Sequence, residues 1–273
     1  MTREGTSPEI IDQTRASIAR VYDVFLGGKD NYEVDREVAN AVIEQIPQTL
    51  RFAQEHRAWL IRVVRFLAKA GIDQFLDCGS GLPTAENTHE AVQRVNPEAR
   101  VVYVDIDPIV ATHGRAILER NERTRFVAGD LTRPRDLWND PVISGHLDLS
   151  RPVALIQCST IHHVPDEQRP AEIMREYVDL LPSGSYLALT HWHDPADGSE
   201  GSEIARYISE VFNGSSMGSG NFRSRAEIEE YFTGLEFVDP GLTLLRDWWP
   251  DGPHVAPADG VDHIVLAGVA RKP

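Results

Sequence analysis

The sequence is poor in cysteine and in positive charge, and it contains no long apolar run. Two of its 273 residues are cysteine, and 27 lysines and arginines stand against 42 aspartates and glutamates, for a net charge of −15. A nucleic-acid-binding surface needs clustered basic residues that neutralise phosphates, so this charge balance argues against one. No stretch of about 18 apolar residues is present, so we expect no transmembrane helix and no membrane partner.

The scarcity of cysteine also bears on the location of the protein. Cys78 and Cys158 both fall in predicted strands, and we expect them to be buried, reduced thiols. The first residues, Met1 to Gln13, are polar and lack the apolar core of a signal peptide. We therefore expect a cytoplasmic protein, and the sequence does not predict its oligomeric state.

Strands alternate with helices from residue 72 onward. The strands are near-continuous apolar runs, which predicts a parallel sheet covered by helices on both faces. The last two strands are expected to form an antiparallel hairpin. We predict strands over 74–78, 100–105, 124–128, 153–159, 185–192, 242–247 and 263–270, and the first two crossover helices near 84–95 and 108–120.

Residues 1–70 are expected to form a helical extension that packs over the carboxyl edge of the sheet as a lid, and 71–273 the main domain. One predicted helix begins near Ala16 and breaks at Gly27 and Gly28, and a second covers 33–46. A third carries the core-facing stripe Leu60, Val63, Val64 and Leu67. Within the main domain, 194–222 reads as an insertion that contains a short amphipathic helix.

Three predicted strands each end in an acid. Asp77 precedes Gly79 and Gly81, whose lack of a side chain permits a tight turn and the close approach of a ligand. A carboxylate at this point repels a pyrophosphate and attracts an ammonium group. Asp105 ends the next strand, where an acid suits the two hydroxyls of a ribose. Asp130 follows the third strand and could accept from the amine of adenine.

In this order and spacing, the three motifs resemble class I S-adenosylmethionine-dependent methyltransferases. A narrower resemblance covers nearly the whole chain and is to a bacterial S-adenosyl methyltransferase family whose members mostly have no known substrate. The stretches that carry it are R-V-Y-D at 20–23, G-G-K-D-N at 27–31, G-L-P-T-x-x-N-x-H-E at 81–90 and H-H-V-P-D at 162–166. The resemblance implies a Rossmann-like α/β fold, here with seven strands, and S-adenosylmethionine as cofactor.

Carried over position by position, the resemblance also implies the residues that bind the cofactor. Those implied for the methionine end and the methyl group are Asp77, Gly79, Ser80, Gly81, Cys158 and Ser159, within a segment from Gln157 to Thr160 that passes the sulfonium. Those implied for the adenosine are Asp105, Ile106, Asp130 and Leu131. Further implied cofactor-binding positions are Tyr22, Gly28, Asn31, Asn87 and His89. Asn87 and His89 would help to hold the amino-acid tail or the N-terminal lid, or else be polar residues on a helix surface. The loop that contains Gly28 could close on a ligand or simply separate two helices, and Arg57 is a weaker candidate for the methionine carboxylate.

Methyl transfer requires a base only if the acceptor must lose a proton. Histidines titrate near working pH, and several lie where the fourth and fifth strands end. The candidate bases are His162, His163 and His191, followed by His193 and Asp194. A metal site made of the last three is disfavoured because alternate residues of a strand point to opposite faces. Tyr22, Tyr32 and Trp192 could face a cationic group, but core packing is favoured.

The sequence therefore predicts a methyltransferase that acts on an oxygen or nitrogen atom of a small molecule. One alternative is a nicotinamide-dependent oxidoreductase. It is disfavoured because Thr84 stands where the third glycine of its motif belongs, and because Asp77 precedes the glycines. The other alternative is a protein that binds the cofactor without catalysis and acts as a regulator, and nothing in the sequence excludes it.

Overall fold

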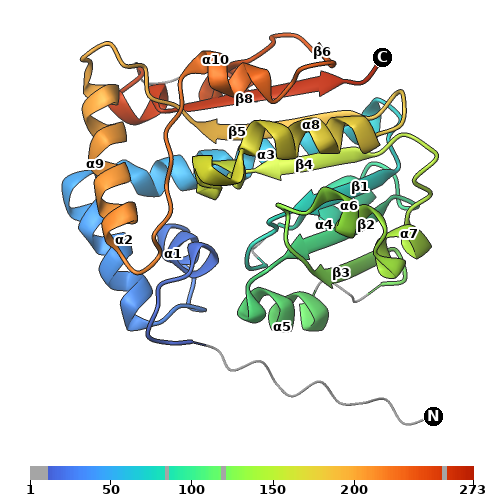
Figure 1. Ribbon diagram of the computed structural model, residues 1–273, viewed down its shortest axis with the longest axis horizontal. Coiled ribbons are helices and arrows are strands. Elements are labelled where there is room, and N and C mark those ends of the chain that lie inside the picture. The colour runs from blue at the N-terminus through green and yellow to red at the C-terminus, as the bar shows by residue number, and fades with distance from the viewer. Residues whose placement is uncertain (1–11, 84–85, 118–120, 254–256) are drawn as a thin grey trace.

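The computed structural model describes residues 12–83, 86–117, 121–253 and 257–273, which form one twisted sheet between two layers of helices (Figure 1). Along the sheet the strands run in the order β3-β2-β1-β4-β5-β8-β6, and β7 also pairs with β8. Residues 1–11 and Thr84, about which the sequence made predictions, lie outside the described residues.

The five parallel strands match the predicted strands to within a residue at either end, and they carry the predicted α/β fold. Their interior positions are almost all buried, because helices cover both faces of the sheet. Parallel pairing brings their carboxyl ends to one edge of the sheet. These strands are β1 (Gln74–Cys78), β2 (Arg100–Asp105), β3 (Thr124–Ala128), β4 (Ala154–Cys158) and β5 (Tyr186–Trp192).

The antiparallel part of the sheet differs in detail from the expected hairpin. β8 (Val265–Arg271) pairs antiparallel with β5, which confirms the predicted antiparallel last strand. The expected strand over 242–247 shrinks to β7 (Thr243–Leu244), after which the chain turns into a short 3₁₀ helix, and the short β6 (Glu236–Phe237) was not predicted. The chain turns there because the buried Leu245 and Trp248 pack into the core below the sheet. The described residues therefore form eight strands and not seven.

Alternate strand residues feed two separate hydrophobic cores. Phe75 and Val101 face the layer of α3 (Thr49–Lys69), α4 (Thr88–Gln93) and α5 (Pro108–Ile117). Leu76 and Val102 face the layer that lies in front of the sheet in Figure 1. That layer contains α6 (Pro134–Trp138), α7 (Pro141–His146), α8 (Pro170–Leu180) and α10 (Arg225–Glu230).

Helix α4 begins later than the predicted helix over 84–95. Asn87 is its N-cap, and the Asn87 N–H donates to Glu90 Oε2 at 2.7 Å, which closes a capping box. The segment between the glycines and Asn87 is consequently loop where it is described, at residues 80–83 and 86–87. Helix α5 begins at Pro108 as predicted, and the end expected near 120 lies outside the described residues.

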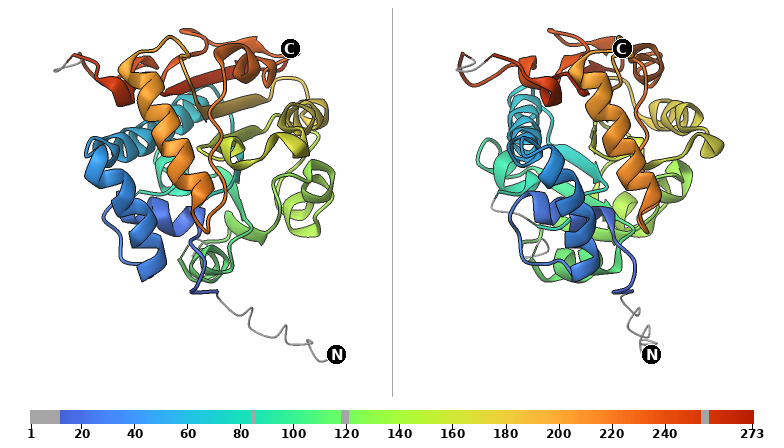
Figure 2. Two further views of the ribbon diagram at one scale, coloured as in Figure 1. Left: turned by 60° about the vertical axis from the view of Figure 1, so that its left-hand side comes forward. Right: turned by 90° about the vertical axis from the view of Figure 1, so that its left-hand side faces the viewer.

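Three helices lie beyond the carboxyl ends of the strands: α1 (Ile18–Phe25), α2 (Glu33–Gln45) and α9 (Glu200–Gly214) (Figures 1 and 2). Helices α2 and α9 lie side by side, and the Tyr207 hydroxyl donates to the Ala41 carbonyl oxygen at 2.7 Å. Ala16 N–H, just before α1, donates to Ser216 Oγ, just after α9. The N-terminal helices and the insertion over 194–222 thus cover this edge of the sheet together.

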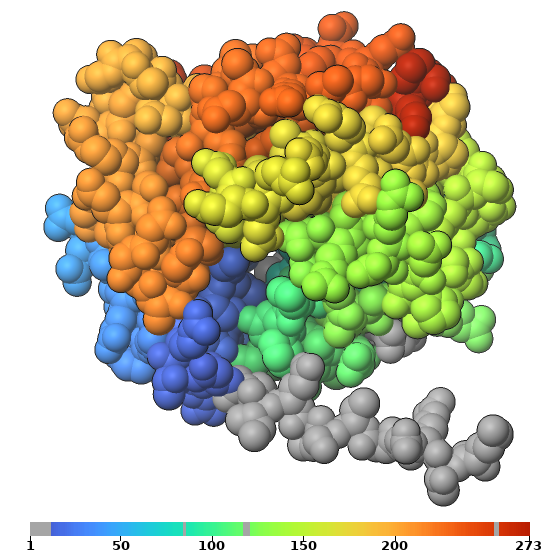
Figure 3. Space-filling model, in the orientation of Figure 1, coloured from blue at the N-terminus to red at the C-terminus, as the bar shows by residue number. Residues whose placement is uncertain are grey.

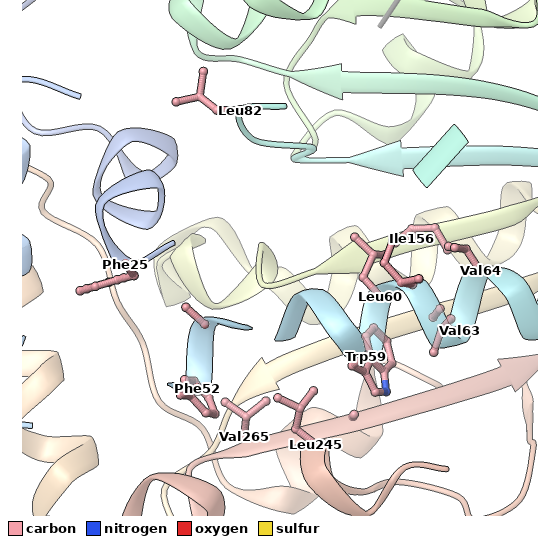
Figure 4. Packing of buried hydrophobic residues seen from close by; sticks show 14 of the residues in the cluster. Phe25, Phe52, Trp59, Leu60, Val63, Val64, Leu82, Ile156, Leu245 and Val265 are labelled. Carbon is pink, nitrogen blue, oxygen red and sulfur yellow. The ribbon is translucent and has the colours of Figure 1, made fainter. Parts of the chain in front are cut away.

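Helix α3 runs along a face of the sheet and is part of its core (Figure 4). Trp59 and Val63 are fully buried, and Trp59 packs edge-on against Trp248 with ring centroids 6.0 Å apart. Leu60, Val63, Val64 and Leu67 are all buried, as their spacing predicted. Among the described residues, no helix combines the length and the apolar character that crossing a bilayer requires.

Candidate functional site

A cavity of about 520 Å³ opens at the carboxyl edge of the sheet, between the strand ends and helices α1, α3 and α9. Figure 3 shows the surface hollowed where the blue N-terminal helices meet the green and orange parts of the chain. Many of the predicted site residues line it: Tyr22, Asp77, Gly79, Ser80, Gly81, Asp105, Ile106, Asp130, Leu131, Cys158, Ser159, His162 and His163. Others are not among the described lining residues: Gly28, Asn31, Asn87, His89 and His191.

The glycine loop after β1 is held against the neighbouring strand. Gly79 N–H and Ser80 N–H both donate to the carbonyl oxygen of Val104, at 2.7 and 3.1 Å. Gly79 has φ 72°, and a Cβ there would lie 2.3 Å from Thr160 Cγ2. Gly81 has φ 66°. Only glycine adopts these conformations readily. Because glycine also lacks a side chain, the main chain of this loop forms part of the cavity wall.

Asp77 is a buried acid whose position suits a cationic ligand. Its exposed fraction is 4%, and its Oδ2 accepts from Thr88 Oγ1 at 2.7 Å. Burial raises the pKa of this carboxyl to about 6, against the hydrogen bond from Thr88 and the attraction of Arg57. An ammonium group bound beside Asp77 would stabilise the ionised carboxylate and offset this cost.

Asp105 is the second buried acid, at the end of β2. Its Oδ2 accepts from Gly81 N–H at 2.8 Å and its Oδ1 from Asp107 N–H at 2.9 Å. Burial raises the pKa of this carboxyl to about 6 as well. A carboxylate oxygen can accept two hydrogen bonds, so each oxygen retains capacity for a hydroxyl donor. Beside it, the side chain of Ile106 is 69% exposed and offers an apolar surface at the cavity wall.

Asp130 follows β3 and completes a row of three acids. Its Oδ1 accepts from Thr132 N–H and Thr132 Oγ1 at 2.8 and 2.7 Å. The next residue, Leu131, is fixed by its carbonyl oxygen, which accepts from the Tyr177 hydroxyl at 2.8 Å. Because the strand order is β3-β2-β1, Asp130, Asp105 and Asp77 follow one another along the sheet edge. We call this side of the cavity, from β3 to β1, the acidic half.

The segment after β4 lies in the middle of the sheet edge. Cys158, Ser159 and Thr160 line the cavity, whereas Gln157, predicted in the same segment, is not among the described lining residues. Ser159 has φ 62°, a conformation that costs a non-glycine residue free energy, and its N–H donates to Thr190 Oγ1 at 2.8 Å. Burial raises the pKa of the Cys158 thiol to about 12, so this thiol stays protonated.

The other side of the cavity lies beyond β4 and β5 and is aromatic. His162, which is fully buried, stacks on Trp192 with centroids 4.0 Å apart and an interplanar angle of 14°. Trp192 in turn stacks on Phe222 at 5.0 Å and contacts Phe212 at 5.4 Å. We call this side the aromatic half; the lining residues that define it are Phe52, His56, His162, His163, Trp192, Phe212 and Phe222.

Within the described residues, neither ring nitrogen of His162 has a hydrogen-bond partner. The other two lining histidines are bonded, His163 Nδ1 to Ser219 Oγ at 3.1 Å and His56 Nε2 to Thr190 Oγ1 at 3.2 Å. Burial lowers the pKa of His163 to about 4, that of His56 to about 3, and that of His162 well below its usual value. All three imidazoles are therefore neutral near pH 7.

His191, the third predicted candidate base, lies behind the aromatic half. Its Nδ1 donates to the Trp192 carbonyl oxygen at 2.7 Å, and its Nε2 accepts from Arg223 Nη1 at 2.9 Å. Both nitrogens are thus engaged by the protein. His193 Nδ1 also bonds to the protein, at the Arg223 carbonyl oxygen. In the described part of the chain, no group of three or more histidine, cysteine, aspartate or glutamate side chains is arranged so that it could hold a metal ion.

The predicted residues outside the cavity wall make hydrogen bonds and contacts that stabilise the structure around the cavity. Asn31 Nδ2 donates to Asp23 Oδ2 at 2.8 Å, and a Cβ at Gly28 would lie 1.9 Å from Asp23 Oδ1. The G-G-K-D-N loop therefore folds around the Asp23 carboxylate. His89 Nδ1 bonds to the Tyr103 hydroxyl at 2.9 Å. It lies in α4, whose first residue binds Asp77.

Sequence reasoning missed most of the aromatic half. Phe52 and His56 lie on the α3 face next to the stripe that was read as core, and Phe212 and Phe222 lie in the insertion. The available signal was the pair His56 and Arg57, one turn before the apolar stripe of α3. Arg57 does line the cavity, and its Nη2 donates to the Glu86 carbonyl oxygen at 2.6 Å.

The comparisons with known proteins agree with this geometry. A family model described as S-adenosyl methyltransferase matches residues 4–273. A crystal structure of a candidate methyltransferase from Thermobifida fusca YX is 40% identical, with 96% of each chain covered and a TM-score of 0.89. A DUF574 family protein from Streptomyces avermitilis MA-4680 is 38% identical, with 97% of this chain and 100% of that chain covered and a TM-score of 0.90. No curated protein matches the chain.

The family model covers all of the described residues, both halves of the cavity included, and the match sets aside the nicotinamide alternative. The chain belongs to the S-adenosyl methyltransferase family, and its cofactor is S-adenosylmethionine.

Proposed function

We propose that this enzyme methylates an oxygen or nitrogen atom of a small molecule that binds in the aromatic half of the cavity, and that it does so in the cytoplasm. The observation that carries the proposal is the enclosure of the cavity by α1, α3 and α9. A space of about 520 Å³ shared with a cofactor leaves room for a small molecule and not for a polymer. The net charge of −15 disfavours a nucleic-acid substrate.

In this proposal the acidic half holds the cofactor. Asp77 and the main chain of Gly79, Ser80 and Gly81 hold the methionine end, because a buried carboxylate attracts its ammonium group. Asp105 accepts from the ribose hydroxyls, Ile106 packs on the adenine face, and Asp130 and Leu131 meet the adenine edge. The remaining predicted residues do not contact the cofactor and instead stabilise the loop after α1 and helix α4, which position these groups; they are Gly28, Asn31, Asn87 and His89.

When bound, S-adenosylmethionine supplies an electrophilic methyl group on a sulfonium. The protein's contribution is to hold the acceptor in line with that methyl group and to exclude water. Cys158, Ser159 and Thr160 form the wall between the two halves, and the protonated thiol of Cys158 does not compete as a nucleophile. Of the three candidate bases, His162 is the one whose two ring nitrogens both lack a hydrogen-bond partner in the described structure.

Residues 1–70 act in part as the lid of this cavity. Ala16, Val21 and Tyr22 line it, and the Ser17 hydroxyl donates to the Asp107 carboxylate. Asp107 N–H donates to Asp105, so one short chain of hydrogen bonds links α1 to the proposed ribose site. Entry of the cofactor then requires α1 to move away from the strand ends.

The test is to follow the methyl group. The protein is incubated with S-adenosylmethionine that carries an isotopically labelled methyl group and, in separate reactions, with the small-molecule, protein and nucleic-acid fractions of a bacterial lysate. We expect label in the small-molecule fraction alone. Label in protein or nucleic acid would contradict the proposal, and cofactor binding with no labelled product in any fraction would favour the regulatory alternative.

A further inference from the structure

We propose that the methyl acceptor is an uncharged, planar aromatic compound whose hydroxyl group donates a hydrogen bond to His162. This inference rests on the proposed function, because it names the substrate class of the same cavity. It follows from the distribution of charge in the cavity, from the geometry of the aromatic stack and from the buried ring nitrogens of His162, which have no hydrogen-bond partner in the described structure.

Charge is confined to one half of the cavity. The charged side chains among its described lining residues are Arg57, Asp77, Asp105, Asp107 and Asp130. The four acids lie at or just after the carboxyl ends of β1, β2 and β3, and Arg57 reaches Glu86 in the loop after the glycines. The residues that define the aromatic half include no aspartate, glutamate, lysine or arginine, and their histidines are neutral near pH 7.

One charged side chain behind the aromatic half, Arg223, is already paired. Arg223 is 5% exposed, and its Nη2 donates to Asp166 Oδ1 at 2.7 Å and to the Val164 carbonyl oxygen at 2.9 Å. Its Nη1 donates to His191. An anionic acceptor would therefore gain little from Arg223, and a buried ion without a partner is costly. The acceptor is consequently uncharged.

The aromatic half is built to contact a flat ring. Phe222, Trp192 and His162 form a continuous stack, with interplanar angles of 27° and 14° between neighbours. Phe212 adds a further ring at 5.4 Å from Trp192. Aromatic side chains favour stacked or edge-on contacts with other rings, and such pairs contribute beyond simple burial of area. A planar aromatic compound uses this surface better than an aliphatic one.

His162 supplies the polar contact for the hydroxyl group of the acceptor. It is fully buried, it lines the cavity, and in the described structure both of its nitrogens are without a partner. A neutral imidazole has one nitrogen that accepts a hydrogen bond. A hydroxyl donor on the acceptor would satisfy that nitrogen, and leaving a buried polar atom unsatisfied costs free energy.

The transfer balances without a further reactant. The acceptor oxygen forms a bond to the methyl carbon while the carbon–sulfur bond breaks, and the bonding pair stays on sulfur. The hydroxyl proton passes to the accepting nitrogen of His162 and then to solvent. The products are the methyl ether, S-adenosylhomocysteine and a proton.

The experiment measures three matched probes by calorimetry on the full chain saturated with S-adenosylhomocysteine, which cannot donate a methyl group. The probes are 2-naphthol, 2-naphthoate and naphthalen-2-ylmethylammonium, which share one ring system and differ in charge. We expect 2-naphthol to bind at least about tenfold more tightly than either ion, because either ion would be buried without a counter-charge. Equal or tighter binding of an ion overturns the proposal.

Two variants test the contact with His162. His162→Phe retains a flat ring on Trp192 and removes both nitrogens, so we expect about a tenfold loss of 2-naphthol affinity, the cost of one unsatisfied donor. His162→Gln restores an acceptor atom and is expected to recover part of that affinity. His113→Phe, on α5 and away from the described lining residues, is the matched control and should bind 2-naphthol as the parent does.

Affinity for S-adenosylhomocysteine and the melting temperature are measured for each variant, which separates loss of the contact from loss of the fold. Unchanged 2-naphthol affinity in His162→Phe overturns the inference. If S-adenosylhomocysteine binds and 2-naphthol does not, the substrate class is wrong while the proposed function stands. If S-adenosylhomocysteine does not bind the parent protein, the proposed function fails, and the inference fails with it.

Discussion

The two halves of the cavity are built in opposite ways. The acidic half comes from three consecutive strand ends, and each acid is held by nearby main chain or by the helix that follows its own strand: Asp105 by Gly81 and Asp107, and Asp77 by Thr88. The aromatic half is assembled from α3, two strand ends and the insertion around α9, which are far apart in the sequence. One half carries buried charge, and the other carries none.

In the proposed function, the two halves serve two different tasks of the enzyme. The cofactor always has the same structure and has a cationic end. Buried acids on short loops that are held by hydrogen bonds suit such a ligand. The acceptor must be aligned and shielded from water, and a wall of aromatic rings with one imidazole that lacks hydrogen-bond partners in the described structure suits that task. We therefore expect changes in one half to leave binding in the other largely intact.

The largest expected effect is on the stability of the aromatic half. Trp192→Ala removes the ring that His162, Phe212 and Phe222 all contact. We expect a loss of about 3 kcal/mol in the free energy of unfolding, as for large-to-small changes in packed sites. Affinity for S-adenosylhomocysteine should stay within about threefold of the parent, since sites without shared contacts behave nearly additively.

Chemical denaturation and calorimetry provide the two readouts for this variant. Trp249→Ala, at a tryptophan that is 46% exposed, is the matched control and should cost less stability. A Trp192→Ala protein that is stable but has lost its affinity for S-adenosylhomocysteine would show that the two halves are not independent.

The next largest effect is on cofactor affinity. Asp105→Ala removes the carboxylate assigned to the ribose and also releases Gly81 N–H. We expect affinity for S-adenosylmethionine to fall by about 1–3 kcal/mol, the value of a charge-assisted hydrogen bond. Binding of 2-naphthol, measured in the presence of saturating S-adenosylhomocysteine, should not change. Unchanged cofactor affinity by calorimetry would show that the ribose lies elsewhere.

The acidic half should also make cofactor affinity depend on pH. The pKa values of Asp77 and Asp105 lie near 6 in the free protein, raised by burial, whereas the bound ammonium and hydroxyl groups favour the ionised carboxylates. Binding therefore releases protons, and affinity should fall by up to about tenfold per pH unit for each carboxylate below about pH 6. It should be constant near pH 8.

The same groups predict a pH effect on stability. Because both folded-state pKa values lie above the usual value for aspartate, the free protein binds more protons than the unfolded chain between about pH 4 and about pH 6. These two acids therefore make the free protein less stable as pH rises through that window. Asp105→Asn should reduce the effect, which thermal unfolding at a series of pH values would measure. A variant with the parent's pH profile would contradict the assigned pKa.

The smallest effect concerns the contact that fastens α1 to the strand ends. Ser17→Ala removes the hydrogen bond to Asp107 and the cap of α1, and should cost about 1 kcal/mol of stability. If α1 is the lid, S-adenosylhomocysteine should also dissociate severalfold faster from this variant in stopped-flow measurements. Thr112→Ala, a loss of an exposed helix hydroxyl on α5, is the control. Equal dissociation rates in the two variants would argue against the lid.

The sequence predicted the acidic half because its signals are local. A strand, an acid and a pair of glycines lie within a few residues of one another, and the parallel sheet then brings the three strand ends to one edge. The start of α4 was harder to predict, because the capping box of Asn87 and Glu90 competes with Pro83 as a helix start.

The aromatic half could not be predicted in the same way. Phe52 and His56 are indistinguishable by periodicity from core residues of α3, and Phe212 reaches the cavity only because α9 packs across α2. The histidines of the rim were recognised as a group, but only the structure separates His162, whose nitrogens have no partner in the described residues, from His191, which is bound by Arg223. Those distinctions depend on tertiary contacts.

The most direct test is a crystal structure of the full chain with S-adenosylhomocysteine. The account predicts the ribose hydroxyls on Asp105, the adenine between Ile106 and Leu131, and the amino group beside Asp77, with the aromatic half left open to an acceptor. An adenosine bound against Trp192 and His162, or an amino group far from Asp77, would contradict it.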